Sequence, residues 1–103
     1  MLPIEPYTHL PGITGTSVPL FFRRPGVHHT TLACTLISAE GEATLEYTLS
    51  PLTKVADDTA HWLPAGDAQS TSFGDTTDGT LTALRLNVAS GTWDVEITLD
   101  ALD

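Results

Sequence analysis

The sequence predicts an all-β protein, a small antiparallel β-sandwich of immunoglobulin-like or jelly-roll-like type. In the segment TWDVEITLD, residues 92–100, every second residue is apolar: Trp93, Val95, Ile97 and Leu99. Only a strand places such a series on one face and the intervening acidic residues on the other. Elsewhere no window of the chain shows the apolar spacing of a helix, and turn signals separate about six or seven short runs, as in sandwiches and small barrels.

The first quarter of the chain differs from the rest because it holds five of the seven prolines: Pro3, Pro6, Pro11, Pro19 and Pro25. Proline lacks a backbone donor and restricts the residue before it, which excludes a helix and disfavours a central strand. We therefore expect an extended Pro-rich arm over residues 1–25, with at most a short strand at 16–22, and a sandwich domain over residues 26–103.

The arm carries apolar side chains that must be covered, either by its own sandwich or by a neighbouring subunit. A backbone stiffened by proline docks at a lower entropic cost, which favours the neighbouring subunit. Arg23 and Arg24, half of the four cations, follow these residues and are either solvated or paired with acidic faces of an adjacent copy. The expected partner-binding residues are Ile4, Tyr7, Leu10, Ile13, Leu20, Phe21, Phe22, Arg23 and Arg24.

The remaining strands follow from alternating or continuous apolar runs bounded by turn residues. They are expected at residues 27–38, 42–50, 80–88 and 92–102, with a short strand or edge segment at 61–66. Between them lie a turn at 39–42, a loop or short helical turn at 53–60, a weakly specified turn-rich region at 67–79 and a hairpin turn at 89–91. In the strand expected at 80–88, Arg85 and Asn87 are placed outward, and the alternate residues Leu84, Leu86 and Val88 therefore point into the core. The predicted core is Leu32, Cys34, Leu36, Leu45, Tyr47, Leu49, Leu84, Leu86, Val88, Trp93, Val95, Ile97 and Leu99.

The charge, the apolar runs and the cysteine content of the chain exclude several classes of function. The chain has 103 residues, thirteen acidic against four basic, and a net charge of −9, which argues against nucleic acid as a partner. Its N-terminus lacks the features of a signal peptide, and no apolar run approaches the length of a membrane span. The single cysteine, Cys34, forms no intrachain disulfide and is expected to pack as a small buried hydrophobe. We expect a protein made in a cytosol, without a membrane partner.

Residues able to bind metal are present but not in a ligating pattern. His28 and His29 are adjacent in a predicted strand and so point to opposite faces. The segments with Asp57 and Asp58, and with Asp75 and Asp78, lack the spacing of a calcium loop and suit turn chemistry better. Neither a nucleophile elbow nor a phosphate loop occurs. We expect no catalytic residues, no metal and no cofactor, and a protein that is not an enzyme.

The aromatic residues offer one candidate ligand contact. Tyr47 and Trp93 lie in the apolar phase of their strands and are expected in the core. Trp62, in the irregular segment HWLPAG, is left as a candidate contact for a carbohydrate or receptor, together with residues 67–79.

Residues 43–99 carry a succession of structural motifs. A YTLSP turn at 47–51 precedes a loop of aspartate and alanine that leads to Trp62; ALR at 83–85 and the SGTxxxE hairpin at 90–96 follow. This succession resembles small β-sandwich proteins encoded among the virion structural genes of tailed bacteriophages. The resemblance implies a capsid decoration (cement) subunit assembled into the virion in the host bacterial cytoplasm, or a head–tail neck or tail accessory subunit. Its implied partners are the major capsid protein or other virion structural proteins, with a homo-oligomer or symmetric array of its own. It assigns no functional residues.

Overall fold

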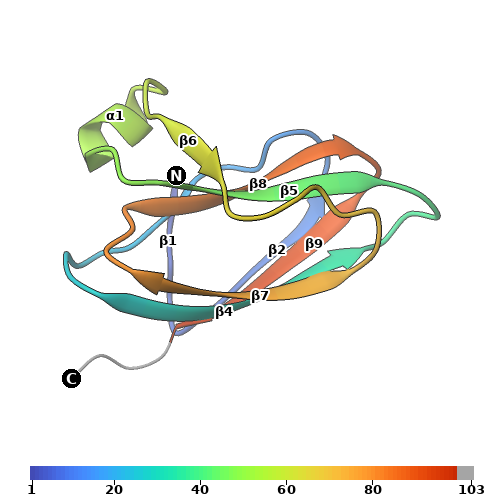
Figure 1. Ribbon diagram of the computed structural model, residues 1–103, viewed down its shortest axis with the longest axis horizontal. Coiled ribbons are helices and arrows are strands. Elements are labelled where there is room, and N and C mark those ends of the chain that lie inside the picture. Colours follow the sequence, from blue (N-terminus) through green and yellow to red (C-terminus); the bar gives the residue numbers. More distant parts are fainter. Residues whose placement is uncertain (100–103) are drawn as a thin grey trace.

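A computed structural model describes residues 1–99 and shows an all-β sandwich of two sheets (Figure 1), which confirms the predicted fold class. One sheet has five strands in the order β1-β3-β8-β5-β6, and the other has four in the order β2-β9-β4-β7. All neighbouring strands are antiparallel except β1 and β3, which are parallel. The elements are β1 (Leu2–Pro3), β2 (Tyr7–Ile13), β3 (Leu20–Phe21), β4 (His28–Leu36), β5 (Glu42–Thr48), α1 (Leu52–Ala56), β6 (Trp62–Pro64), β7 (Phe73–Gly79), β8 (Ala83–Ser90) and β9 (Trp93–Leu99).

The strand order decides between the two types of sandwich. From β2 to β9 the chain passes repeatedly between the layers, leaving β2, β9, β4 and β7 in one sheet and β3, β8, β5 and β6 in the other. Eight strands wound in this way form two Greek keys, the topology of a jelly roll. The N-terminal strands β2 and β3 therefore lie against the C-terminal strands β9 and β8.

The core lies between the sheets and matches most of the predicted set. The largest fully buried side chains include Trp93, Leu32, Leu84, Leu86 and Ile97. The predicted core members Leu36, Tyr47 and Leu99 are partly buried and pack against this cluster.

Leu49 was predicted in the core, and this is wrong, since its side chain is 61% exposed. Strand β5 ends at Thr48, which is fully buried and whose hydroxyl donates a hydrogen bond to the His61 carbonyl oxygen at 2.6 Å. The inward position at the end of β5 is thus taken by a hydrogen-bonded threonine, and the next residue faces solvent.

The N-terminal segment is not a separate arm. It supplies β1 and β3 to the five-stranded sheet and β2 to the four-stranded sheet, and its most deeply buried side chains belong to the common core. These side chains are Ile4, Ile13, Leu20 and Phe22.

The prolines fit this arrangement because each stands where the sheets need no backbone donor. Pro3 lies in β1, which is an edge strand, and Pro11 lies in the register shift of β2 between Leu10 and Ile13. Pro6, Pro19 and Pro25 fall outside the strands. Edge strands and bulges are the positions at which sheets tolerate proline.

Other elements agree with the sequence except at one turn and one strand. The turn at 89–91 was expected to close a hairpin, and this is wrong, because it connects β8 and β9, which lie in different sheets. The helical turn corresponds to α1 and the short edge segment to β6. The turn-rich region 67–79 instead contains a full strand, β7, paired with β4 along its whole length. The last strand is confirmed as far as Leu99; its expected continuation at 100–102 lies outside the described residues.

Candidate functional site

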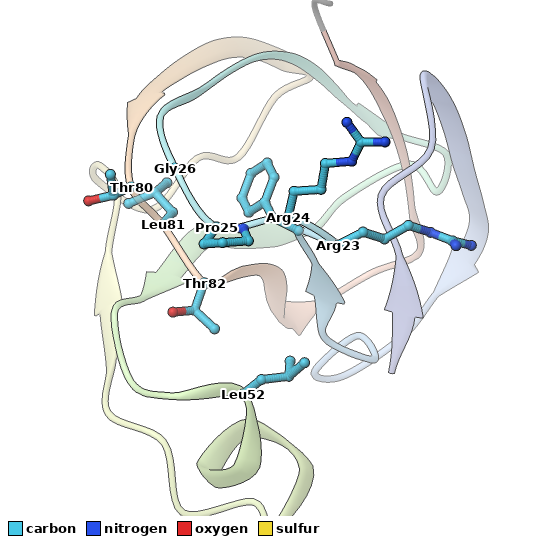
Figure 2. Close-up of a pocket in the computed structure, with 9 residues that line it drawn as sticks. Arg23, Arg24, Pro25, Gly26, Leu52, Thr80, Leu81 and Thr82 are labelled. Carbon is cyan, nitrogen blue, oxygen red and sulfur yellow. The ribbon is translucent and has the colours of Figure 1, made fainter. Parts of the chain in front are cut away.

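A hollow at one end of the sandwich is lined by two of the four cations of the chain, Arg23 and Arg24, and is the candidate interaction site (Figure 2). The connection between β3 and β4, the first residue of α1 and the turn between β7 and β8 form it, and its volume is about 340 Å³. We call it the arginine hollow. It is lined by Phe22, Arg23, Arg24, Pro25, Gly26, Leu52, Thr80, Leu81 and Thr82.

Buried residues fix the backbone that carries the two arginines. The Phe22 ring stacks on the His28 ring with centroids 4.3 Å apart and an interplanar angle of 18°. His28 Nε2 lies 2.6 Å from the Arg24 carbonyl oxygen, and since a carbonyl only accepts, this nitrogen is the donor. Gly26 has a φ of +119°, a conformation that side-chain-bearing residues rarely adopt. The loop is therefore held in one conformation from its buried side.

The two arginines have different electrostatic partners. Arg23 forms an ion pair with Glu5 at 2.7 Å, while both side chains remain largely in solvent. Arg24 makes no ion pair within residues 1–99, and neither does Lys54 of α1. Figure 2 shows the Arg23 and Arg24 side chains leaving the loop in different directions. Arg24 thus offers, in a strongly acidic chain, an exposed guanidinium that no acidic group of residues 1–99 pairs with, on a backbone held by His28.

The outer surface of the four-stranded sheet carries the opposite charge. Asp94 accepts a hydrogen bond from the Gly12 backbone N–H at 2.8 Å and lies 3.5 Å from His9 Nε2. The Tyr7 hydroxyl donates to Glu96 at 2.9 Å, and this hydrogen bond to a carboxylate raises the pKa of Tyr7. With Asp78, which pairs with His29 at the far edge, these carboxylates form what we call the acidic face.

The structure separates the residues predicted to bind a partner into two groups. Tyr7, Arg23 and Arg24 are exposed, so the surface retains them. The apolar members fill this chain's own core or are partly buried, and the prediction that they form an exposed docking arm is wrong. They are Ile4, Leu10, Ile13, Leu20, Phe21 and Phe22.

Trp62 is engaged within the chain. The Arg85 guanidinium carbon lies 4.3 Å from the centroid of the Trp62 ring. The same guanidinium donates to the Glu46 carboxylate at 2.7 Å, and both members of this ion pair are mostly buried. One ring face is therefore covered by a cation–π contact, which leaves less aromatic surface for a sugar to stack on.

The structure does not gather the side chains that could bind a metal, and it buries the single thiol. Within residues 1–99 no three or more histidine, cysteine, aspartate or glutamate side chains are placed to hold a metal ion. Cys34 is buried, and burial, with a smaller effect from nearby Asp75, raises the pKa of its thiol to about 12. The predictions that the protein is not an enzyme and binds no cofactor stay predictions.

Neither a protein-family model nor a curated protein matches the chain. Within the described residues, no helix has the length and apolar character required to cross a bilayer.

Proposed function

We propose that the chain is a structural subunit of a bacteriophage virion, most simply a capsid decoration protein that attaches through protein–protein contacts. The jelly-roll topology supports this proposal because viral capsid domains are among the proteins built on it. Since one fold hosts many functions, the proposal depends mainly on the surface of the molecule.

The observation that carries the proposal is the separation of positive and negative charge on the surface of a small domain. The arginine hollow presents Arg24 without a partner in residues 1–99, and the acidic face presents Asp94 and Glu96. Copies that each carry a net charge of −9 repel one another when crowded on a particle. A positive end that meets an acidic surface of the next subunit or of the coat offsets this repulsion and sets the orientation of the contact.

Copy number in purified particles tests the proposal. Mass spectrometry of virions produced by the virus that encodes this chain is expected to find on the order of hundreds of copies, as a symmetric shell requires. About six or twelve copies would place the subunit at the neck or tail instead. Absence of the chain from purified particles would contradict the proposal.

Substitution of Arg24 tests the contact itself. We expect Arg24→Glu to lower the occupancy of added subunit on stripped particles about tenfold at equal subunit concentration, because like charges then face one another. Arg24→Lys, the matched control, keeps the charge and retains most of the binding. Equal occupancy for Arg24→Glu and the unmodified protein would remove the arginine hollow from the attachment site.

A further inference from the structure

A second surface lies along one flank of the sandwich, between the edge strands β6 and β7 of the two sheets. Two hollows, each of about 370 Å³, follow this flank and share Asp75 in their walls. We call them together the flank groove. The flank groove shares Leu81 with the arginine hollow but contains no residue of the loop between β3 and β4 that carries Arg23 and Arg24.

Strand β7 presents an open edge to solvent. It pairs with β4 on one side and ends its sheet on the other. In an antiparallel pair, alternate residues direct their N–H and C=O groups away from the partner strand. The Thr76 N–H donates to the Asp75 carboxylate at 2.8 Å, so it is not a bond of the ladder with β4. The Asp75 carboxylate thus accepts a hydrogen bond from the N–H group that would otherwise donate to the carbonyl oxygen of an added strand.

The wall beside this edge is apolar. Tyr47, Leu49, Ala65 and Leu81 line the same hollow as Asp75 to Asp78. Leu49 is 61% exposed, and Leu63, the register partner of Tyr47, is 50% exposed. An isolated exposed leucine is ordinary, but a wall of apolar side chains next to an open strand edge is the arrangement to which extended peptides add.

The charge of the groove selects its occupant. Asp67, Asp75 and Asp78 line it, and neither lysine nor arginine is among its lining residues. Asp75 and Asp78 belong to opposite phases of β7, so Asp75 faces the apolar wall and Asp78 faces the outer surface, where it also contacts His29. A second copy pairing through its own β7 would bring aspartates against aspartates, which destabilises an antiparallel pair.

From these observations we infer that the flank groove binds an extended segment of a partner protein in which lysine or arginine alternates with apolar residues. The segment adds to β7 as a further strand. Its apolar side chains lie on the inner face and cover the wall at Leu49, and its cations lie on the outer face, where β7 presents Asp78. The carbonyl oxygen of the new strand replaces the Asp75 carboxylate as the acceptor of the Thr76 N–H. This inference depends on the open edge of β7 and holds whether or not the chain is a virion subunit.

The test uses the full chain and fluorescein-labelled peptide TKVKVKT as the probe, with TEVEVET as its acidic counterpart. Fluorescence anisotropy is expected to show saturable binding of the basic peptide and at least about tenfold weaker binding of the acidic one. Thr76→Pro removes the outward donor at an edge position that tolerates proline and is expected to weaken binding about tenfold or more. Thr76→Ala, which keeps the N–H, serves as its control and binds as the unmodified protein does.

A second pair of variants tests the apolar wall without touching β7. Leu49→Ser is expected to weaken binding about tenfold, whereas Ile37→Ser, which changes a similarly exposed residue outside the groove, leaves it unchanged. Absence of saturable binding, or equal binding by Thr76→Pro and the unmodified protein, would overturn the inference. Self-association of the chain that Thr76→Pro abolishes would identify a second copy as the occupant and would also overturn it.

Discussion

The N-terminal segment, residues 1–25, and the C-terminal segment, residues 83–99, fill the same core by different means. The C-terminal segment does so with two long strands that lie in opposite sheets, β8 and β9, and the register of β8 shifts only near its end, between Val88 and Ser90. The N-terminal segment does so with short or bulged strands, of which β2 lies against β9, β3 against β8 and β1 against β3. Leu20 stands opposite Leu84 in the sheet, and both are buried. Prolines therefore mark where the ladder is interrupted and do not show that a segment leaves the fold.

The largest effect is expected from deleting residues 1–22. The deletion removes β1, β2 and β3 and uncovers the strands beneath them, together with the core positions of Ile4, Ile13, Leu20 and Phe22. We expect a chain without a cooperative thermal transition, since losing several buried side chains exceeds the stability of a small domain. Circular dichroism during heating shows whether the truncated chain has a cooperative transition. A truncated chain that unfolds cooperatively at the original temperature would restore the idea of a detachable arm.

Truncation of the paired leucines compares the two regions directly. Leu20→Ala and Leu84→Ala each remove a large buried side chain and are expected to lower the free energy of unfolding by about 2–5 kcal/mol. Leu49→Ala, at an exposed site, serves as the control and is expected to cost less than about 1 kcal/mol. Urea denaturation monitored by tryptophan fluorescence gives the three values. A cost for Leu20→Ala near that of the control would show that the N-terminal segment is loosely held.

Substitution of one glycine in each segment, Gly12 and Gly91, compares the backbone of the two segments. Gly91, between β8 and β9, has a φ of +82°, and an added Cβ would stand 2.5 Å from the Glu40 carbonyl oxygen. Gly12, in the bulged part of β2, has a φ of +64° but open space around it. We expect Gly12→Ala to cost about 1–2 kcal/mol through its backbone conformation alone. Gly91→Ala is expected to cost more, because the backbone must also move, and equal urea midpoints would contradict this.

The smallest effect is expected from alkaline pH acting on Cys34. Its thiol has a pKa raised from 9.0 to about 12 in the folded chain, so folding favours the protonated form. This contribution to stability is fully present below pH 9 and is lost as the pH rises toward 12. Between pH 7 and 8.5 we expect no change in stability and no reaction of the native protein with a disulfide reagent. Rapid reaction of the folded protein at pH 8 would place the thiol at the surface.

Alternation of side chains was sufficient to predict β9 and the phase of β8, because long half-buried strands separate apolar from polar residues. It was insufficient for β7, where FGDTTDG holds glycine and aspartate, residues that are unfavourable in strands but common on exposed edges. Arg23 and Arg24 were recognisable from the sequence as concentrated charge. The ion pair of Arg23 with Glu5, the cover of Trp62 by Arg85 and the flank groove all depend on which strands become neighbours, and a single sequence does not specify this.

Hydrogen exchange of the intact chain tests most directly the claim that the N-terminal segment belongs to the core. The Ile4 N–H donates to the Phe21 carbonyl oxygen at 2.8 Å, and the Phe22 N–H donates to the Thr82 carbonyl oxygen at 3.1 Å. Two-dimensional NMR after transfer to deuterated buffer is expected to show both amides protected to the same degree as those of β8, because they open only with global unfolding. Exchange of both amides in the first spectrum, while β8 and β9 stay protected, would contradict the account.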